Sequence, residues 1–345
     1  MARRLSVLRT SALVALVFAY TLCASMVCHA QNPIVLEYAN TPPASTFPCI
    51  QMERWAAEVT RRTGGRVVIR THPASTLLNF STLYEGVVSG RADIGCLHLS
   101  SRPGDFPLSE LFELPVGFPN AKVASVTFLD FLLRHRPDEF SAVKILTAFT
   151  SGPSCIMSKV PIGRMSDLPG LEIRAVGKGV GVLDALGAVP VALPMSQTRD
   201  ALHDGMVKGV LSSPEVLMDM NFAEYCKFVS TERFQVHPFV VIMNSESWDG
   251  LPKDVKRVMD GLSREHALWT GAYADDQARR ALQWSLERHG IQMTSLAVSD
   301  ANRMREVMEN LVESTCVTSE EHGVPSRAVL EEIRTAISKS KTSDR

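Results

Sequence analysis

Three short segments near the start of the chain have the pattern of strands, and in the first of them apolar and polar residues alternate. The pattern predicts strands at Ile34–Asn40, Arg66–Thr71 and Ala92–Leu97. Between them, apolar residues recur at helical spacing in Cys49–Thr63 and Ser81–Ser89. This β-α-β-α-β order is typical of a parallel sheet covered by helices. The first part of the chain is therefore predicted to form an α/β layer.

A second set of apolar segments begins near Ile145 and again alternates between strand and helix patterns. The predicted strands are Val143–Phe149, Ser154–Ser158, Glu172–Val176, Ala188–Leu193, Gly209–Ser212 and Pro238–Asn244. The predicted helices are Val180–Leu186, Ser196–Asp204, Asp254–Arg288 with breaks at Gly261 and Gly271, Asp300–Ser319 and Ser326–Ser338. Residues 341–345 are predicted to be a disordered tail.

Length and strand order together predict two domains. A chain of 345 residues is long enough for two. The apolar strand Pro238–Asn244 returns after the second unit, so the chain is expected to cross between domains more than once. We assign residues 31–150 and 242–270 to lobe I, and residues 151–241 and 271–340 to lobe II. Ligands of open α/β sheets bind outside the carboxyl ends of strands, so two facing lobes would share a cleft.

The first thirty residues differ from the rest. Arg3, Arg4 and Arg9 precede the uncharged segment Ala12–Val27, and small residues surround Ala30. These are the basic, apolar and cleavage regions of a signal peptide, which predicts export to the periplasm with cleavage near Ala30. An uncleaved membrane anchor is the alternative, but an apolar run of about 16 residues is short for a span of roughly 20.

Charge and composition argue against several other classes of protein. The chain has 36 Lys and Arg against 37 Asp and Glu, and the loss of three leader arginines would leave it mildly acidic. Nucleic acid is therefore not an expected partner. The later cysteines lack metal-ligand spacing, so we predict no metal and expect buried, unpaired thiols at Cys49, Cys96, Cys155, Cys226 and Cys316.

No cofactor and no catalytic residues are predicted. Gly177, Gly179 and Gly181 follow a strand, but the third glycine comes too early for a dinucleotide-binding loop. We interpret them as a flexible turn whose backbone amides can approach an anion. No arrangement of nucleophile, base and acid stands out, so the chain is not expected to be an enzyme.

Arg174 lies inside an apolar predicted strand and is the main candidate for ligand binding. A guanidinium stays charged at any accessible pH, and burying it is costly unless an anion meets it. Its planar set of donors suits a carboxylate bidentately. The sequence therefore predicts a site for a small organic acid. The alternative is a surface arginine paired with Glu172 or Asp167.

Several motifs occur in the order and spacing of one family of binding proteins. They are GGRVVIRTHPASTLL, SGRADIG, FPLSELFELP, LPGLEIR, LGAVPV, ALHDGMVKG and VVIMNSESWDGLPKDVKRVM. Together they resemble the DctP-type solute-binding proteins of TRAP transporters over nearly the whole chain after residue 33. The resemblance implies an α/β, two-lobed periplasmic binding protein of type II-like fold, with a cleft between the lobes and a long helix spanning both.

The resemblance also implies a function and some roles. Such a protein captures a carboxylate and delivers it to the small and large membrane subunits of the transporter. Arg174 would pair bidentately with the ligand carboxylate, and Asn244 would lie at or near the ligand, although a turn or cap is the other reading for an asparagine there. Gln197 stands where the family usually has glutamate, which puts that contact in doubt.

Other residues at or near predicted strand ends are candidates for the lining, with ordinary core packing as the alternative for each. They are Tyr38, Asn40, Phe80, His98, Ser154, Met195, Pro214, Glu215, His237 and Phe239. Several of these side chains are aromatic, and that of Met195 is flexible and apolar. Thr150–Lys159 contains no arginine, whereas family members that bind sugar acids or dicarboxylates often have a second arginine near this position. We therefore expect an aromatic or branched monocarboxylate. A dicarboxylate or sugar acid, or a sensing role for a receptor kinase, are the alternatives.

Overall fold

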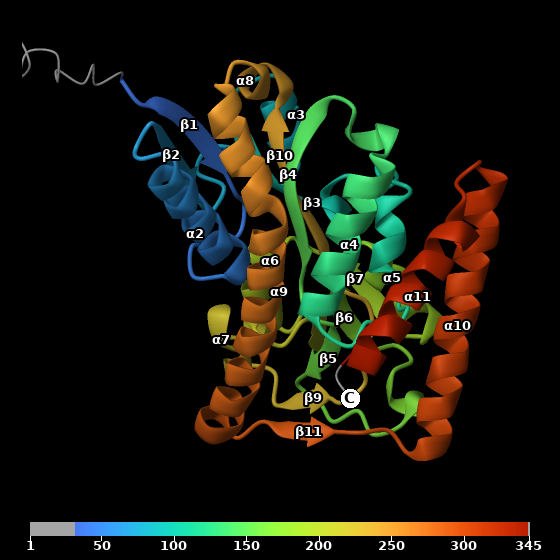
Figure 1. Ribbon diagram of the computed structural model, residues 1–345. Helices are drawn as coiled ribbons and strands as arrows, with labels where there is room; N and C mark the ends of the chain where they lie inside the picture. Colours follow the sequence, from blue (N-terminus) through green and yellow to red (C-terminus); the bar gives the residue numbers. More distant parts are fainter. Residues whose placement is uncertain (1–31, 344–345) are drawn as a thin grey trace, which may run out of the picture. The chain divides into compact units, whose positions relative to one another are not determined.

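The computed structural model describes residues 32–343, and from Val35 onward these residues form one compact unit with two β-sheets (Figure 1). The predicted leader, residues 1–30, lies outside the described residues. The first sheet has the order β2-β1-β3-β10-β4. Its strands are β1 (Ile34–Ala39), β2 (Val67–His72), β3 (Ile94–His98), β4 (Val143–Thr150) and β10 (Pro238–Asn244).

The first sheet is mixed, because β10 enters it from far along the chain. β1 and β3 are parallel, with Tyr38 opposite Ile94, as the strand–helix order predicts. β10 lies between β3 and β4 and is antiparallel to both. All seven of its residues are buried. The predicted boundary between residues 241 and 242 therefore falls inside β10, and the whole strand belongs with the first sheet.

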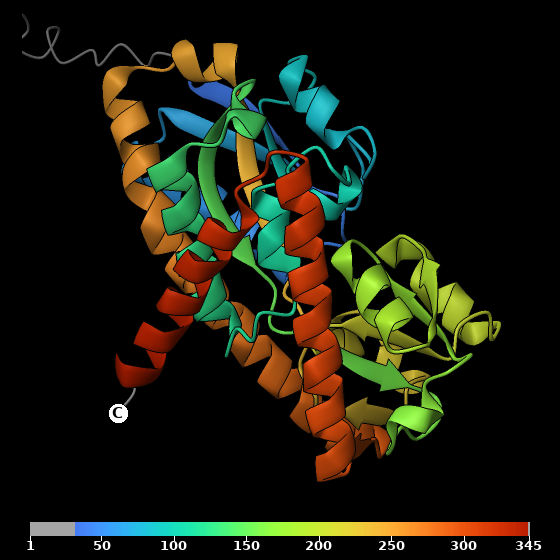
Figure 2. The ribbon, with the colours of Figure 1, turned by 90° about the vertical axis from the view of Figure 1, so that its right-hand side faces the viewer.

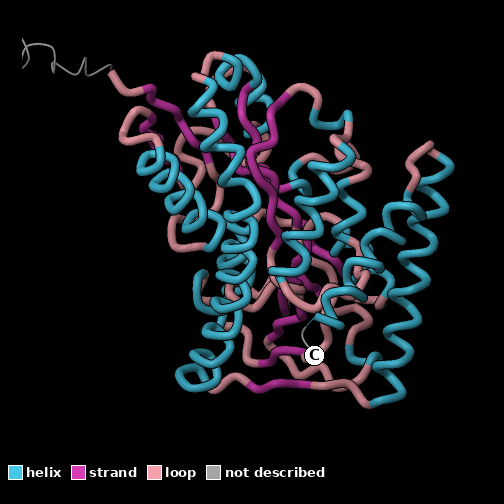
Figure 3. The backbone as a smooth tube through the Cα atoms, viewed as in Figure 1, coloured by secondary structure: helices cyan, strands magenta, loops and turns pink. Residues whose placement is uncertain are grey.

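Helices lie against the first sheet (Figure 3), and their apolar residues form a large core with it. In α2 (Phe47–Arg62), Met52, Trp55, Ala56 and Val59 share one buried face, since they recur at three- and four-residue spacing. Other helices of this part include α3 (Leu83–Val88), α4 (Ala121–His135) and the 3₁₀ segments η1 (Leu99–Ser101), η2 (Ser109–Glu113) and η3 (Asp138–Phe140). α4 was not among the predicted helices.

The second sheet has the order β11-β9-β5-β8-β6-β7. Its strands are β5 (Cys155–Ser158), β6 (Glu172–Ala175), β7 (Val189–Ala192), β8 (Gly209–Ser212), β9 (Phe228–Ser230) and β11 (Gln292–Thr294). The helices α5 (Lys178–Ala185), α6 (Met195–His203) and α7 (Val216–Asp219) belong to two apolar clusters built on this sheet. The three-residue strands β9 and β11 were not predicted.

Two long helices connect the cores. α9 (Lys253–His289) is continuous over 37 residues, so the predicted breaks at Gly261 and Gly271 are wrong. It contacts α2, α4 and β4 beside the first sheet and α7 beside the second. α10 (Val298–Glu321) also reaches both cores, with Met304 and Met308 in one and Val312 and Cys316 in the other (Figure 2). After β10 comes α8 (Ser245–Asp249).

The C-terminal helix differs from the prediction in extent and in place. α11 runs over Ser326–Ser343, so residues 341–343 are helical and not part of a disordered tail; residues 344–345 lie outside the described part. Its residues Leu330, Ile333 and Ile337 pack into the core of the first sheet. Residues 271–340 therefore do not all belong with the second sheet, because helical packing carries α11 back to the first.

The five cysteines of the described residues are buried and unpaired, as predicted. Burial raises the pKa of the Cys49, Cys155 and Cys226 thiols to about 12. No helix within residues 32–343 is both long enough and apolar enough to cross a bilayer.

Gly271 of α9 permits a close approach to α4, and its substitution tests this packing. A Cβ atom at Gly271 would lie 2.6 Å from Lys122 Cα, whereas nothing lies within 4 Å of one at Gly261. We expect Gly271→Ala to lower the free energy of unfolding by about 1–3 kcal/mol through overpacking. Gly261→Ala, the matched control on an exposed part of the same helix, should raise it by up to about 1 kcal/mol. Urea unfolding of both variants measures the difference, and equal effects would contradict this account.

Candidate ligand-binding site

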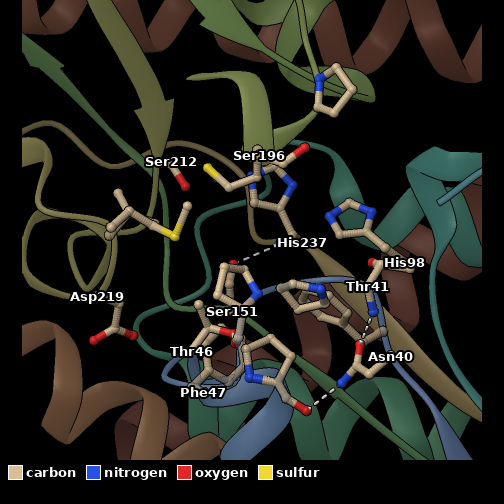
Figure 4. Close-up of a pocket in the computed structure, with 18 of the residues that line it drawn as sticks. Asn40, Thr41, Thr46, Phe47, His98, Ser151, Ser196, Ser212, Asp219 and His237 are labelled. Atoms are coloured by element: carbon tan, nitrogen blue, oxygen red, sulfur yellow. Dashed lines mark hydrogen bonds between the residues drawn. The ribbon is translucent and has the colours of Figure 1, made fainter. Parts of the chain in front are cut away.

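A cavity of about 150 Å³ is lined by residues from both sheets (Figure 4). From the first sheet come the ends of β1 and β3 and the start of β10, with Asn40, His98 and Phe239. From the second come β6, the end of β8 and the segment that follows it, with Arg174 and Glu215. The carboxyl ends of strands in both sheets therefore meet at one site, as the α/β pattern predicts.

Arg174 supplies the one guanidinium or ammonium group among the described lining residues. The side chain is 2% exposed, within a strand that has β7 on one side and β8 on the other. Its Nε donates to Leu193 O at 2.9 Å, and within residues 32–343 no carboxylate forms a salt bridge with it, Glu172 and Asp167 included. Burial lowers the pKa of Arg174 to about 10, which leaves it charged at neutral pH. The position therefore holds a buried cation beside an open cavity.

A buried carboxylate, Glu113, lies on the first-sheet side and has its partners within the protein. Its Oε1 lies 2.9 Å from His237 Nδ1 and accepts from Ser100 Oγ at 2.9 Å. Its Oε2 accepts from the backbone N–H of Lys178 at 3.3 Å. A Cβ at Gly177 would lie 2.4 Å from this carboxylate. The glycine turn does approach an anion, as predicted, and that anion is the chain's own Glu113.

A second contact fastens the same turn. Lys178 Nζ pairs with Glu110 Oε2 at 2.9 Å, and Glu110 and Glu113 both belong to η2. Neither acid was a candidate in the sequence, although both lie in the quoted segment FPLSELFELP. The sequence signal for them was the presence of two acids in an otherwise apolar segment. Carboxylates are seldom buried unless they are paired, so such acids are expected to have specific partners.

His237 lies between Glu113 and Ser154, an order that resembles a catalytic triad. Ser154 Oγ lies 3.3 Å from His237 Nε2. Ser154, however, is 0% exposed and does not line the cavity, so a substrate there cannot reach its hydroxyl. The contact instead joins the residue before β5 to the residue before β10. Ser154 was a predicted lining residue, and burial removes it from that role.

His98 is held neutral at the cavity wall. Desolvation, with smaller effects from His237 and Arg174, lowers its pKa well below the usual range. Its ring lies 4.7 Å from that of Phe239 and 5.9 Å from that of Phe80, and the ring of Phe47 lies 5.8 Å from Phe239. This side of the cavity therefore presents an aromatic wall. Phe47 was missed, because it is the first residue of α2 and the predicted helix began only at Cys49.

Two carboxyl groups lie on the second-sheet side. Glu215 is 3% exposed; one oxygen accepts from Ser213 Oγ, and the other, Oε2, has no partner. Asp219 Oδ2 is also buried without a partner. Desolvation raises the pKa of both groups to about 7, and for Glu215 the nearby Asp219 and Asp275 add to the effect. Glu215 was predicted and Asp219 was not, although it follows four residues later.

Comparison with known proteins gives the family. Residues 38–318 match the DctP family, described as "Bacterial extracellular solute-binding protein, family 7". The chain belongs to this family. It is similar to a TRAP periplasmic solute-binding protein from Desulfovibrio salexigens, an open complex, with 46% identity over 89% of this chain and 96% of the other and a TM-score of 0.81.

Two more distant relatives differ in what they bind. A TRAP solute-binding protein from Rhodoferax ferrireducens, in complex with copurified benzoate, is 24% identical over 90% of this chain and 100% of the other, with a TM-score of 0.84. The C4-dicarboxylate-binding periplasmic protein DctP of Rhodobacter capsulatus is 23% identical over 73% of this chain and 77% of that one. The protein is thus a TRAP-type solute-binding protein of the two-lobed fold, related to carboxylate binders of more than one class.

Most of the candidate residues of this DctP-family chain line the cavity. They are Arg174, Asn40, Phe80, His98, Met195, Glu215, His237 and Phe239. The amide of Asn40 is engaged within its own loop, donating to Pro48 O at 2.7 Å and accepting from Thr41 N at 2.9 Å. Lining residues that were not candidates include Phe47, Ser212, Ser213, Val216, Asp219 and Met220.

Asn244 does not lie at the cavity. It ends β10, five residues from Phe239, which corresponds to roughly 17 Å along a strand. Its Oδ1 accepts from Ser247 N at 2.9 Å, and its Nδ2 donates to Val87 O at 2.9 Å and Val88 O at 3.0 Å. The structure therefore shows Asn244 as the cap of α8 and places it outside the cavity lining.

Three further candidates also lie outside the lining. Gln197 is exposed on α6, where Met195 and Ser196 face the cavity instead. Tyr38 is a core residue: its hydroxyl accepts from Gln51 Nε2 at 3.2 Å, and its ring packs edge-on against Trp55. Pro214 is buried between two lining residues without lining the cavity itself.

The raised pKa of Glu215 predicts a pH-dependent stability of the ligand-free protein. The folded-state pKa of about 7 lies above the ordinary value of 4.5, so the stabilising contribution is complete below pH 4 and is lost as the pH rises through 7. Glu215→Gln cannot ionise. We therefore expect its unfolding free energy, relative to the parent protein, to rise by up to about 3 kcal/mol between pH 4.5 and pH 8. Denaturant unfolding at both values measures this gain.

Glu246→Gln is the control for this prediction, because Glu246 is an exposed carboxylate on α8. Its difference from the parent protein should stay constant between the two pH values. If the difference in unfolding free energy between Glu215→Gln and the parent protein is the same at both pH values, folding does not raise the pKa of Glu215 and the prediction is wrong.

Proposed function

We propose that this protein captures a monocarboxylate with an aromatic or branched apolar tail and delivers it to the membrane subunits of a TRAP transporter. The observation that carries the proposal is the buried guanidinium of Arg174, which has no counter-charge within residues 32–343 and lines the cavity. A carboxylate in the cavity would accept from its free donors bidentately. The same contact would offset the cost of burying the cation.

The size and lining of the cavity support a small, apolar tail. About 150 Å³ matches a cavity that holds one benzene ring. Phe47, Phe80 and Phe239 supply aromatic surface, and the relative from Rhodoferax ferrireducens holds benzoate. Arg174 is the one described cationic residue in the lining, so a single carboxylate can be matched. A second carboxylate would meet Glu215 and Asp219.

We infer that the ligand acts by joining the two lobes. The first lobe is built around the first sheet and the second lobe around the second sheet, and Arg174 and His98 approach the cavity from different sheets. A ligand that contacts both sides only when they are close favours the closed state by that difference in affinity. Export to the periplasm through the leader, residues 1–30, is part of the same proposal.

A thermal-shift screen of organic acids tests the ligand class. Bound ligand adds RT ln(1 + [L]/Kd) to stability, about 2.7 kcal/mol at a hundredfold excess over Kd. We expect aromatic or branched monocarboxylates to raise the melting temperature most. If dicarboxylates or sugar acids alone raise it, the proposed ligand class is wrong.

Substitution of Arg174 tests the site. Losing one partner of a buried charge pair costs about 2–5 kcal/mol, so Arg174→Met should weaken binding of the best acid by roughly 30-fold or more. Calorimetry measures the affinity. Because Met keeps the volume and removes an uncompensated charge, the melting temperature without ligand should not fall. Arg199→Ala is the control, since Arg199 is exposed and pairs with Glu224 at 2.9 Å. Equal affinity in Arg174→Met and the parent protein would overturn the assignment.

A further inference from the structure

The cavity has a second polar end that Arg174 does not serve. Figure 4 shows Asp219 and His98 on opposite sides of the cavity, and the charge of Arg174 acts on His98. Arg174 lies on β6, whereas Glu215 and Asp219 lie at the two ends of α7. The cation and the two acids therefore occupy different parts of one lining.

The acceptors at this second end have no donor within the described residues. Glu215 Oε2 and Asp219 Oδ2 are buried and unpartnered, and Ser213 Oγ serves the other oxygen of Glu215. Asp275 on the neighbouring α9 is occupied by the backbone amides of Ala121 and Lys122, at 2.7 and 3.0 Å. The neighbouring lining residues Val216 and Met220 offer no side-chain donor.

Both acids can face one ligand group. Glu215 directly precedes α7 and Asp219 is its last residue, so they stand four positions apart on a single helical turn. Leaving two acceptors buried and unmatched costs free energy unless the ligand supplies donors. A hydroxyl or ammonium group on the ligand would be such a donor.

Building on the proposed function, we propose that the ligand carries a hydrogen-bond donor, a hydroxyl or an ammonium group, at the end remote from its carboxylate, and that Glu215 and Asp219 accept from it. A hydroxyl donates to one acid while the other is protonated. An ammonium pairs with both when they are ionised. A second carboxylate in the same place is repelled by them, so the pair also selects against diacids.

The raised pKa of both acids agrees with this arrangement. Without a donor, desolvation holds Glu215 and Asp219 near half-ionisation at neutral pH. An ammonium group between them would favour the ionised form of each and release protons on binding.

A matched series of ligands tests the proposal in the full-length mature protein by calorimetry at pH 7.5. The parent is the unsubstituted monocarboxylate, aromatic or branched, that binds in the thermal-shift screen. For an aromatic parent the series is benzoate, its 3- and 4-hydroxy derivatives, its 3- and 4-aminomethyl derivatives and terephthalate. We expect the better-placed hydroxyl or aminomethyl acid to bind at least tenfold more tightly than the parent, and the diacid to bind more weakly.

Glu215→Gln separates recognition from a structural role. It should remove most of the tenfold gain, so that within this variant the donor-bearing acid and the unsubstituted parent acid bind with similar affinity. Glu246→Gln, on the exposed surface of α8, should change neither affinity. Circular dichroism and melting temperature confirm that each variant is folded.

The outcomes distinguish this inference from the proposed function. If the parent acid binds and its donor-bearing derivatives bind no better, the inference is overturned and the proposed function stands. An equal loss of affinity for all ligands in Glu215→Gln also overturns it, because that result indicates a structural role. If no monocarboxylate binds the parent protein, both proposals fail.

Discussion

Arg174 places a permanent positive charge where the protein supplies one backbone carbonyl as its partner. The contrast with Glu113 is informative, because Glu113 is also buried and contacts His237 of the same cavity lining. The carboxylate of Glu113 is matched by Ser100, His237 and an amide at the start of α5. The guanidinium of Arg174, by contrast, has no carboxylate partner among the described residues. Because Glu113 is satisfied within the protein and Arg174 has no counter-charge within residues 32–343, the part of the cavity beside Arg174 attracts anions from outside. Strands of both sheets hold this arrangement in place.

The elements were predicted best where apolar segments have sharp polar ends. β8 and β10 have the predicted bounds, because each is a short buried run between turns or polar residues. α4 was missed because apolar residues occur around most of its circumference and leave no narrow stripe. The antiparallel insertion of β10 between β3 and β4 depends on contacts between segments far apart in the sequence, and no local pattern encodes it. Gly271 was read as a helix break, although its role is to let α4 approach.

The site was predictable to the extent that single residues violate burial rules. Arg174 stands out because a charge in an apolar strand needs a reason. Asn244 did not allow a decision, since an asparagine at a strand end serves equally as a cap or a ligand contact, and only its partners Val87 and Ser247 distinguish the two. Phe47 and Asp219 could not be found, because they lie at the start of α2 and the end of α7, and the position of these helix ends at the cavity depends on the packing of both sheets.

The buried thiols have a chemical consequence under the export to the periplasm that we propose. Disulfide exchange proceeds through the thiolate, and a thiol with a pKa of about 12 is almost entirely protonated at neutral pH. Cys49, Cys155 and Cys226 are therefore inert towards oxidants once folding has enclosed them. The thiols can be oxidised more readily before the cores form, because they are then exposed to solvent and burial does not yet raise their pKa. Rapid closure of the apolar clusters thus protects the chain's redox state as well as its shape.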